Sequence, residues 1–153
     1  MKVIFLDIDG VLNCKTSKSK CQNYKGIDND KVKKLKQIVE QTDSRLILCS
    51  SWKKEWEKID KELQDYSANY LDKKLRKEKL YILDKTCDNG NNRGKGILSW
   101  LNKHPNVDKY IILDDELFDY ETTGLLSYLV KTSYYEDGLN DGHVIQAIQM
   151  LNK

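Results

Sequence analysis

Two carboxylates separated by a single residue stand directly after the first apolar run of the chain. Asp7 and Asp9 follow the run 3–6, and Gly10 comes next. Such a run, rich in β-branched and aromatic residues, is typical of a strand buried on both faces, beyond whose carboxyl end ligands of a parallel sheet bind. Close carboxylates repel each other unless they share a proton or a cation, and magnesium accepts such oxygen ligands. The pair therefore predicts a magnesium site, the alternative being a solvated loop after an edge strand.

Polar side chains also follow two later apolar runs. Ser50 and Ser51 follow the second run, and Asp114 and Asp115 follow the fourth. The carboxyl ends of parallel strands meet at one edge of the sheet, so we expect these residues to converge on the first acidic pair. Carboxylates, a hydroxyl and a cation brought together in this way form a phosphoryl-transfer site.

Strands must alternate with helices to position these residues. We expect strands over residues 3–6, 45–49, 80–83, 110–113 and 125–130, and helices over 30–40, 53–79, 94–103 and 144–151. The helical segments carry apolar residues at helical spacing, and the asparagines and glycine of 89–92 indicate a loop. This alternation predicts an α/β fold with a mainly parallel sheet.

The composition describes an ordinary globular chain. We expect residues 1–153 to form a single domain, and 33% charged residues against 39% hydrophobic ones argue against disorder. A net charge of +2 does not by itself indicate a nucleic-acid-binding protein. The first apolar run is too short for a signal peptide, and no stretch has the roughly 20 apolar residues of a membrane span. We therefore expect a cytoplasmic protein without membrane partners.

The four cysteines form no C-x-x-C pair, and neither histidine lies near a pair of them in the sequence. A structural zinc site is not expected from this spacing. Reduced thiols fit the cytoplasmic expectation.

The string DIDGVLN resembles motif I of the haloacid dehalogenase-like (HAD) phosphohydrolases, in which DxDGxx follows an apolar strand. LILCS at 46–50 resembles motif II, and YIILDD at 110–115 resembles motif IV, with Asp119 as its trailing acid. SSW at 50–52, the RGxxIxxWL pattern at 93–101 and Gly138-Leu139 are similar to the HAD domain of Swiss-army-knife RNA repair proteins. The resemblance covers nearly the whole chain. It implies a Rossmann-like three-layer α/β/α sandwich whose five strands have the order third, second, first, fourth, fifth.

The resemblance also implies roles for the acidic residues. Asp7 would be the nucleophile that forms an aspartyl-phosphate. Asp9 would protonate the leaving oxygen and then activate water, while its backbone carbonyl contacts the metal. Asp114 and Asp115 would complete the Mg²⁺ site, one directly and the other through water.

The same comparison implies which groups hold the substrate phosphate. Ser50 would donate a hydrogen bond to a phosphoryl oxygen, with Ser51 as the alternative. The cation that balances the phosphate charge has three candidates in this sequence. Arg93 and Lys95 together are preferred, and Lys85 is the third.

The segments between the motifs leave no room for a large cap domain. We expect a flap at about 13–27 and a helical elaboration at about 53–79, which together leave the site open to large substrates. The expected substrates are phosphorylated RNA or DNA ends or nucleotides. The basic residues of 73–79 would follow a nucleic-acid backbone or form a solvated helix face. Trp52 would stack on a base or sugar, or be a rim aromatic. The sequence leaves the oligomeric state open.

Two other function classes compete with a phosphatase. The first is a non-catalytic binding or regulatory module that keeps the fold, although the complete set of acids and Ser50 argues against decay of the site. The second is a receiver-like signalling domain with Asp84, after the third predicted strand, as the phospho-acceptor. The DxDG string and the Asp114-Asp115 pair fit that scheme poorly.

Overall fold

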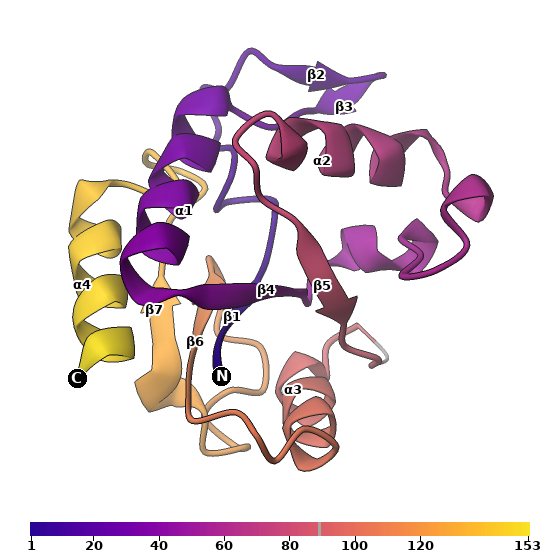
Figure 1. Ribbon diagram of the computed structural model, residues 1–153. Coiled ribbons are helices and arrows are strands. Elements are labelled where there is room, and N and C mark those ends of the chain that lie inside the picture. Colours follow the sequence, from indigo (N-terminus) through magenta and orange to yellow (C-terminus); the bar gives the residue numbers. More distant parts are fainter. Residues whose placement is uncertain (89) are drawn as a thin grey trace.

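A five-stranded parallel sheet forms the centre of the computed structural model, which describes residues 1–88 and 90–153 (Figure 1). Asn89, in the predicted loop, lies outside the described residues. The sheet order is β5-β4-β1-β6-β7, which confirms the predicted order. The strands are β1 (Lys2–Leu6), β4 (Ser44–Leu48), β5 (Ile82–Lys85), β6 (Lys109–Asp114) and β7 (Leu129–Lys131). Because helices pack on both faces of this sheet, the predicted α/β/α sandwich without a large cap is confirmed for the described residues.

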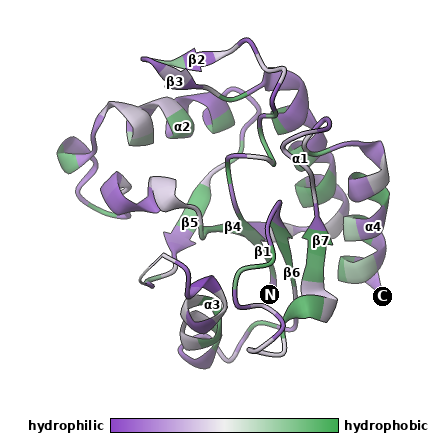
Figure 2. Cartoon of the chain, turned by 180° about the vertical axis from the view of Figure 1, so that it is seen from behind, coloured by the Kyte–Doolittle hydropathy of each residue, from purple (hydrophilic) through white to green (hydrophobic). Residues whose placement is uncertain are grey.

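Helices cover both faces of the sheet. They are α1 (Asn29–Thr42), α2 (Tyr66–Arg76), α3 (Arg93–Asn102) and α4 (Asp141–Asn152). Side chains of α1, α2 and α4 pack with Ile4, Leu6 and Leu46 on one face, and side chains of α3 pack with Val3 and Phe5 on the other. Figure 2 shows hydrophobic residues concentrated in the central strands and hydrophilic ones on the hairpin and the outer helix surfaces. β1 is thus buried on both faces, as its unbroken apolar run predicts.

Two of the predicted strands were placed wrongly. The third begins at Ile82 rather than at residue 80, because Lys79 adopts a left-handed conformation (φ 59°) that turns the chain before the strand. The fifth begins only at Leu129, because the preceding residues form a 3₁₀ turn, η3 (Leu126–Tyr128). Apolar runs alone do not distinguish such turns from strand residues.

The segment between β4 and β5 is less helical than its apolar spacing predicts. It contains two 3₁₀ turns, η1 (Ser51–Glu55) and η2 (Lys61–Leu63), before α2 begins. The side chain of Asp65 caps α2 by accepting a hydrogen bond from the backbone N–H of Ala68 at 2.9 Å. Among the described residues, no helix combines the length and apolar character needed to cross a membrane.

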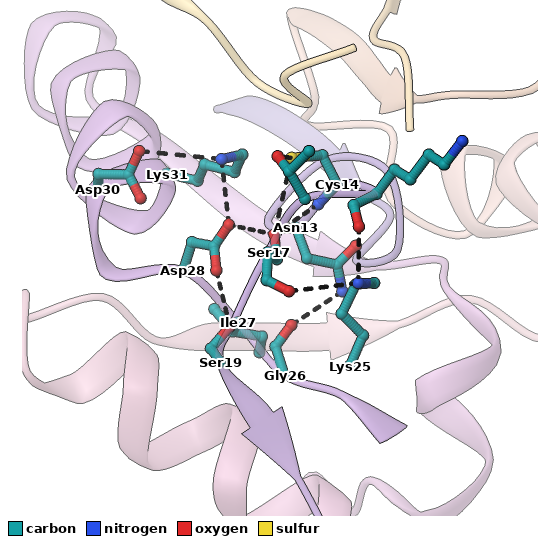
Figure 3. A network of polar contacts seen from close by, with 12 residues as sticks. Asn13, Cys14, Ser17, Ser19, Lys25, Gly26, Ile27, Asp28, Asp30 and Lys31 are labelled. Atoms are coloured by element: carbon teal, nitrogen blue, oxygen red, sulfur yellow. Dashed lines mark hydrogen bonds and ion pairs between the residues drawn. The ribbon is translucent and has the colours of Figure 1, made fainter. Parts of the chain in front are cut away.

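A small hairpin follows motif I, within the segment predicted as a flap. Its strands are β2 (Lys20–Cys21) and β3 (Tyr24–Lys25), which pair antiparallel. The Asp28 carboxylate accepts hydrogen bonds from Ser17 and Ser19 and pairs with Lys31 at 3.1 Å (Figure 3). Asp28 is the residue before α1, yet its side chain does not cap that helix. It instead fastens the start of the hairpin to the body of the protein.

Candidate active site

Three carboxylates meet at the carboxyl edge of the sheet. Asp7 follows β1, and Asp114 and Asp115 stand at the end of the neighbouring strand β6. Asp7, Asp114 and Asp115 each offer an oxygen ligand, and these atoms lie within 4.8 Å of one another. The backbone N–H of Asp7 donates to the carbonyl of Leu113 at 2.9 Å, which continues the pairing of the two strands up to the site. The sheet itself therefore brings together acids that are more than a hundred residues apart.

One guanidinium group lies between two of these acids. The Nη1 atom of Arg93 is 3.0 Å from Oδ1 of Asp7 and 2.9 Å from Oδ2 of Asp114. The phenol of Tyr120 donates to the same Asp114 oxygen at 2.7 Å. Arg93 is 9% exposed and Asp114 is fully buried. Because charges are held here away from water, each depends on its partners for stabilisation.

Burial changes the acidity of this cluster. Burial, followed by the neighbouring Asp114 carboxylate, raises the pKa of Asp7 well above its usual value, although Arg93 opposes the change. The same two causes raise the pKa of Asp115 to about 6. Burial alone would lower the pKa of Arg93, but the Asp7 and Asp114 carboxylates outweigh it and raise that pKa above the ordinary value.

Asp9 lies apart from the three clustered acids and is exposed. Its Oδ1 atom accepts a hydrogen bond from the amide of Asn13 at 2.9 Å, and its Oδ2 atom accepts one from the indole N–H of Trp52 at 3.0 Å. The side chain thus has a fixed orientation despite its exposure.

The two serines of motif II have different surroundings. Ser50 is buried, and its hydroxyl oxygen accepts a hydrogen bond from the backbone N–H of Trp52 at 3.2 Å. Ser51 is exposed and lines a cleft next to Asp9. Both residues follow β4, the neighbour of β1 on the side opposite β6.

Of the three candidate cations, Arg93 is the one that contacts the acids. Lys95 is exposed on α3, and its backbone N–H donates to Asp119 at 3.1 Å. The ammonium of Lys85 donates to the carbonyl oxygens of Lys53 and Trp56, at 2.8 and 2.6 Å. The structure thus brings Arg93 into the acidic cluster and ties Lys85 to the η1 turn.

Asp119, the predicted trailing acid, lies at the start of α3 rather than among the clustered acids. Its carboxylate accepts hydrogen bonds from the backbone N–H groups of Gly94 and Lys95, at 2.6 and 3.1 Å. A Cβ atom at position 94 would lie 2.4 Å from Oγ1 of Thr123 and 2.9 Å from Oδ1 of Asp119. Glycine after Arg93 therefore lets Asp119 cap the helix that carries the guanidinium.

A cleft of about 460 Å³ opens beside Asp9. The hairpin and the beginning of α2 contribute to its walls, and Trp52 and Tyr134 also line it. Cys21, Tyr24 and Lys25 are the lining residues from the two hairpin strands. The flap is thus one wall of a cleft that contains the exposed acid.

The comparison with protein families gives a match over residues 3–144. The matching family is described as the HAD domain in Swiss Army Knife RNA repair proteins. The chain belongs to this family. A comparison with curated proteins gives no match.

HAD domains are hydrolase-type domains that generally use Mg²⁺, and the three clustered acids could hold such an ion. The donor set fits such an ion. Three ionised carboxylates and one guanidinium leave two negative charges at the site. Burial, followed by the neighbouring Asp114 carboxylate, raises the pKa values of Asp7 and Asp115. Hard carboxylate oxygens are the ligands that magnesium prefers. Gly10 (φ 84°) lies so close to Asp115 that a Cβ atom there would be 2.2 Å from its Oδ2 atom.

Several site contacts of this HAD domain were not predicted from the sequence. Asn13 orients Asp9, Tyr120 binds Asp114, and the hydroxyl of Thr132 donates to the carbonyl of Gly10 at 2.6 Å. Asn13 was within the quoted DIDGVLN string, so its place in the motif was the available signal. Tyr120 and Thr132 reach the site through tertiary packing, for which no local pattern gives a signal.

Proposed function

We propose that this HAD domain is a Mg²⁺-dependent phosphatase that acts through an aspartyl-phosphate. The observation that carries the proposal is the convergence of Asp7, Asp114 and Asp115 within 4.8 Å, with Arg93 bound between two of them. A carboxylate attacks a phosphate dianion only where charge is neutralised. This arrangement supplies a nucleophile and a fixed cation, together with acids suited to a divalent ion.

Asp7, Asp114 and Asp115 would hold the magnesium ion, together with the backbone carbonyl of Asp9. When bound, Mg²⁺ supplies charge neutralisation at the phosphate. Asp7 then forms the bond to phosphorus, and Asp9 gives its proton to the leaving oxygen and later takes one from water. Arg93 holds Asp7 and balances the phosphate charge, while the Ser50 hydroxyl donates to a phosphoryl oxygen.

The proposed substrates are phosphorylated RNA or DNA ends or nucleotides. The family description refers to RNA repair, and the flap and the helical segment leave the site uncapped. Exposed basic residues gather at the C-terminal end of α2, the helix whose start borders the cleft. They are Lys73, Arg76, Lys77 and Lys79. In this proposal these residues contact the nucleic-acid backbone, and the terminal phosphate reaches Asp7.

Asp84 supports the phosphatase over a receiver-like domain. Its Oδ2 atom accepts a hydrogen bond from the indole N–H of Trp100 at 2.9 Å, and Asp84 is not among the three clustered acids. A receiver requires its phospho-acceptor within the acidic pocket. The complete set of Asp7, Asp9, Ser50, Asp114 and Asp115 argues against decay to a non-catalytic module.

The decisive variant is Asp7→Asn. We expect it to abolish Mg²⁺-dependent release of nitrophenol from p-nitrophenyl phosphate, because an amide cannot form the phosphoryl-enzyme. Asp43→Asn is the matched control, since Asp43 is exposed and its left-handed conformation suits asparagine. Circular dichroism checks that both variants fold. Wild-type levels of hydrolysis by a folded Asp7→Asn protein would contradict the assignment of Asp7 as the nucleophile.

The substrate class is tested by comparing rates on different phosphate esters. A 3′- or 5′-phosphorylated oligonucleotide is compared with sugar phosphates and mononucleotides by kcat/KM for phosphate release. We expect the phosphorylated end or the nucleotide to be preferred. Equal or better turnover of sugar phosphates would remove the nucleic-acid part of the proposal and leave the phosphatase intact.

A further inference from the structure

The Asp9 carboxylate is held from both sides. Asn13, which donates to its Oδ1 atom, is itself fixed. It accepts from the backbone N–H of Gly10 at 2.9 Å, and it donates to the carbonyl of Gly26, also at 2.9 Å (Figure 3). Trp52 donates to the Oδ2 atom at 3.0 Å. Each carboxyl oxygen keeps a further lone-pair site for a transferable proton. Because both hydrogen bonds fix the orientation of the Asp9 carboxylate, this exposed acid has one preferred direction in which to donate that proton.

Trp52 and Asp9 line the same cleft. Within its described lining, Lys25 is the one cation, and its ammonium already donates to the carbonyl oxygens of Lys15 and Ser17, at 3.0 and 3.3 Å. The lining also contains a second acid, Asp65. The aromatic rings of Tyr24, Trp52 and Tyr134 offer apolar surface. This combination suits an uncharged group with an apolar face better than a second anion.

We propose that the cleft receives the leaving alcohol of the phosphate ester, and that Trp52 is the positioning residue that aligns Asp9 with the leaving oxygen. The inference rests on the proposed phosphatase function and adds to it a leaving-group site for an uncharged alcohol, such as the terminal nucleoside of a phosphorylated end. The phosphate lies over Asp7, so the ester oxygen points toward Asp9 and its substituent occupies the cleft.

The proton balance of the reaction follows from this placement. In the first step an oxygen of Asp7 forms a bond to phosphorus, the bond from phosphorus to the ester oxygen breaks, and the Asp9 proton passes to that oxygen. In the second step Asp9 takes a proton from water, the water oxygen bonds to phosphorus, and the bond to Asp7 breaks. Trp52 keeps its own proton throughout and acts only by orienting Asp9.

The chain provides a matched control for the loss of this contact. The indole N–H of Trp56, four residues later, also donates to a carboxylate at 3.0 Å, but its partner is Asp72. Trp56 is 1% exposed and belongs to the core. Each of the substitutions Trp52→Phe and Trp56→Phe removes one indole–carboxylate hydrogen bond from the same segment. Of the two, Trp52→Phe is the one that removes a hydrogen bond to Asp9.

The experiment compares two substrates by kcat/KM, which reports the phosphoryl-transfer step. Nitrophenolate is a good leaving group that needs little protonation, whereas the alcohol of a nucleoside monophosphate needs the proton of Asp9. We expect Trp52→Phe to lower kcat/KM for the nucleoside monophosphate about tenfold or more, and for p-nitrophenyl phosphate about twofold or less. Trp56→Phe should change both in equal proportion, and thermal unfolding monitors the fold of each variant.

An equal proportional loss on both substrates in Trp52→Phe, or a selective loss in Trp56→Phe, would overturn the positioning role. Wild-type protein that hydrolyses neither substrate would instead refute the proposed function itself.

The charge preference has its own test. Glycerol phosphate and phosphoglycerate have leaving groups of similar size that differ by one carboxylate. We expect a lower kcat/KM for phosphoglycerate, and a smaller difference in Asp65→Asn, because asparagine keeps the helix cap while removing the charge. Equal turnover of the two by the wild type would show that the cleft does not select an uncharged group.

Discussion

Arg93 is the residue on which the two buried acids depend. Its single Nη1 atom contacts both Asp7 and Asp114, and these three side chains are almost completely shielded from water. Removing one partner from a buried ion pair leaves an uncompensated charge, which typically costs about 3–5 kcal/mol. The strength of this contact is therefore visible in stability as well as in activity.

We expect Arg93→Ala to lower the free energy of unfolding by about 3 kcal/mol without Mg²⁺, as measured by urea denaturation. Added Mg²⁺ should restore part of the loss by compensating the same carboxylates. Lys95→Ala, two residues along the same helix, should change stability by less than about 0.5 kcal/mol because the side chain is exposed. Similar losses in both variants would contradict the assignment of Arg93 as the balancing cation.

The raised pKa of Asp115 gives a pH dependence. The pKa is about 6 in the metal-free fold, whereas the unfolded chain releases this proton near the usual pKa of about 4. Without metal, the folded state takes up a proton as the pH falls from about 7 to 5, so the wild type gains stability relative to Asp115→Asn over this range.

Mg²⁺ needs the ionised carboxylate, so it should raise the melting temperature of the wild type more at about pH 7 than at about pH 5. Differential scanning fluorimetry in EDTA and in Mg²⁺ measures both effects. A magnesium effect that is independent of pH would indicate that Asp115 is not a ligand.

At the residue scale, the sequence predicted the acids of the site but not the side chains that hydrogen-bond to them. Asp7, Asp114 and Asp115 follow apolar strands, and strand ends converge by the rules of parallel sheets. The hydrogen bonds from Asn13 to Asp9 and from Tyr120 to Asp114 depend on exact loop geometry, which has no periodic signature. For the same reason, three cations remained candidates until Arg93 was located between the acids.

The hairpin is the element that closes one side of the cleft, and Asp28 fastens it. Burial alone would raise the pKa of Asp28, but hydrogen bonds from Ser17, Ser19 and Lys31 outweigh it and lower that pKa below its usual value. The stabilisation is therefore present above about pH 4 and is lost as the pH falls further through the folded-state pKa. The flap is thus tied to the body by a charged group that stays ionised at neutral pH.

We expect Asp28→Asn to reduce stability by about 1–3 kcal/mol and to raise the KM for alkyl phosphates, because charge-assisted hydrogen bonds to the flap are lost. Asp30→Asn is the matched control, since the Asp30 side chain is 71% exposed and lies 3.8 Å from the same lysine. Urea denaturation and steady-state kinetics measure the two effects. An unchanged KM in Asp28→Asn would show that the flap does not shape the substrate site.

At the element scale, the order of strands and helices could be predicted because buried strands and amphipathic helices have distinct periods. The errors lie where an apolar run covers a turn. Tyr81 and Leu83 are exposed although their run is apolar, and β5 is an edge strand that begins two residues later than predicted. Leu125 is buried at the start of η3, before β7. A buried apolar residue that pairs with no strand has the same sequence signal as a strand residue.

The whole molecule is nearly neutral, so its charge acts through local distribution. The exposed basic residues Lys73, Arg76 and Lys77 lie about 9–15 Å along α2 from Ser67, which lines the cleft at the start of the helix. A strand whose end occupies the site would need several nucleotides to reach them. Binding of oligonucleotides should therefore depend on their length, and it should depend more steeply on salt concentration than binding of mononucleotides.

Binding of a phosphorylated oligonucleotide to the Asp7→Asn protein tests this arrangement. We expect the double variant Lys73→Ala, Lys77→Ala to reduce the slope of log affinity against log salt concentration by about two, one per phosphate contact. Lys33→Ala with Lys103→Ala removes the same charge from exposed positions elsewhere. Equal changes in both double variants would indicate a non-specific effect of net charge.

The three tryptophans of the chain differ in their access to water. Trp56 and Trp100 are 1% and 6% exposed, whereas Trp52 is only partly buried, at the rim of the cleft. A soluble quencher such as iodide or acrylamide should therefore dim the emission of Trp52 first. The protein therefore carries a built-in optical reporter at the edge of its candidate active site, through which ligand arrival can be followed without any attached dye.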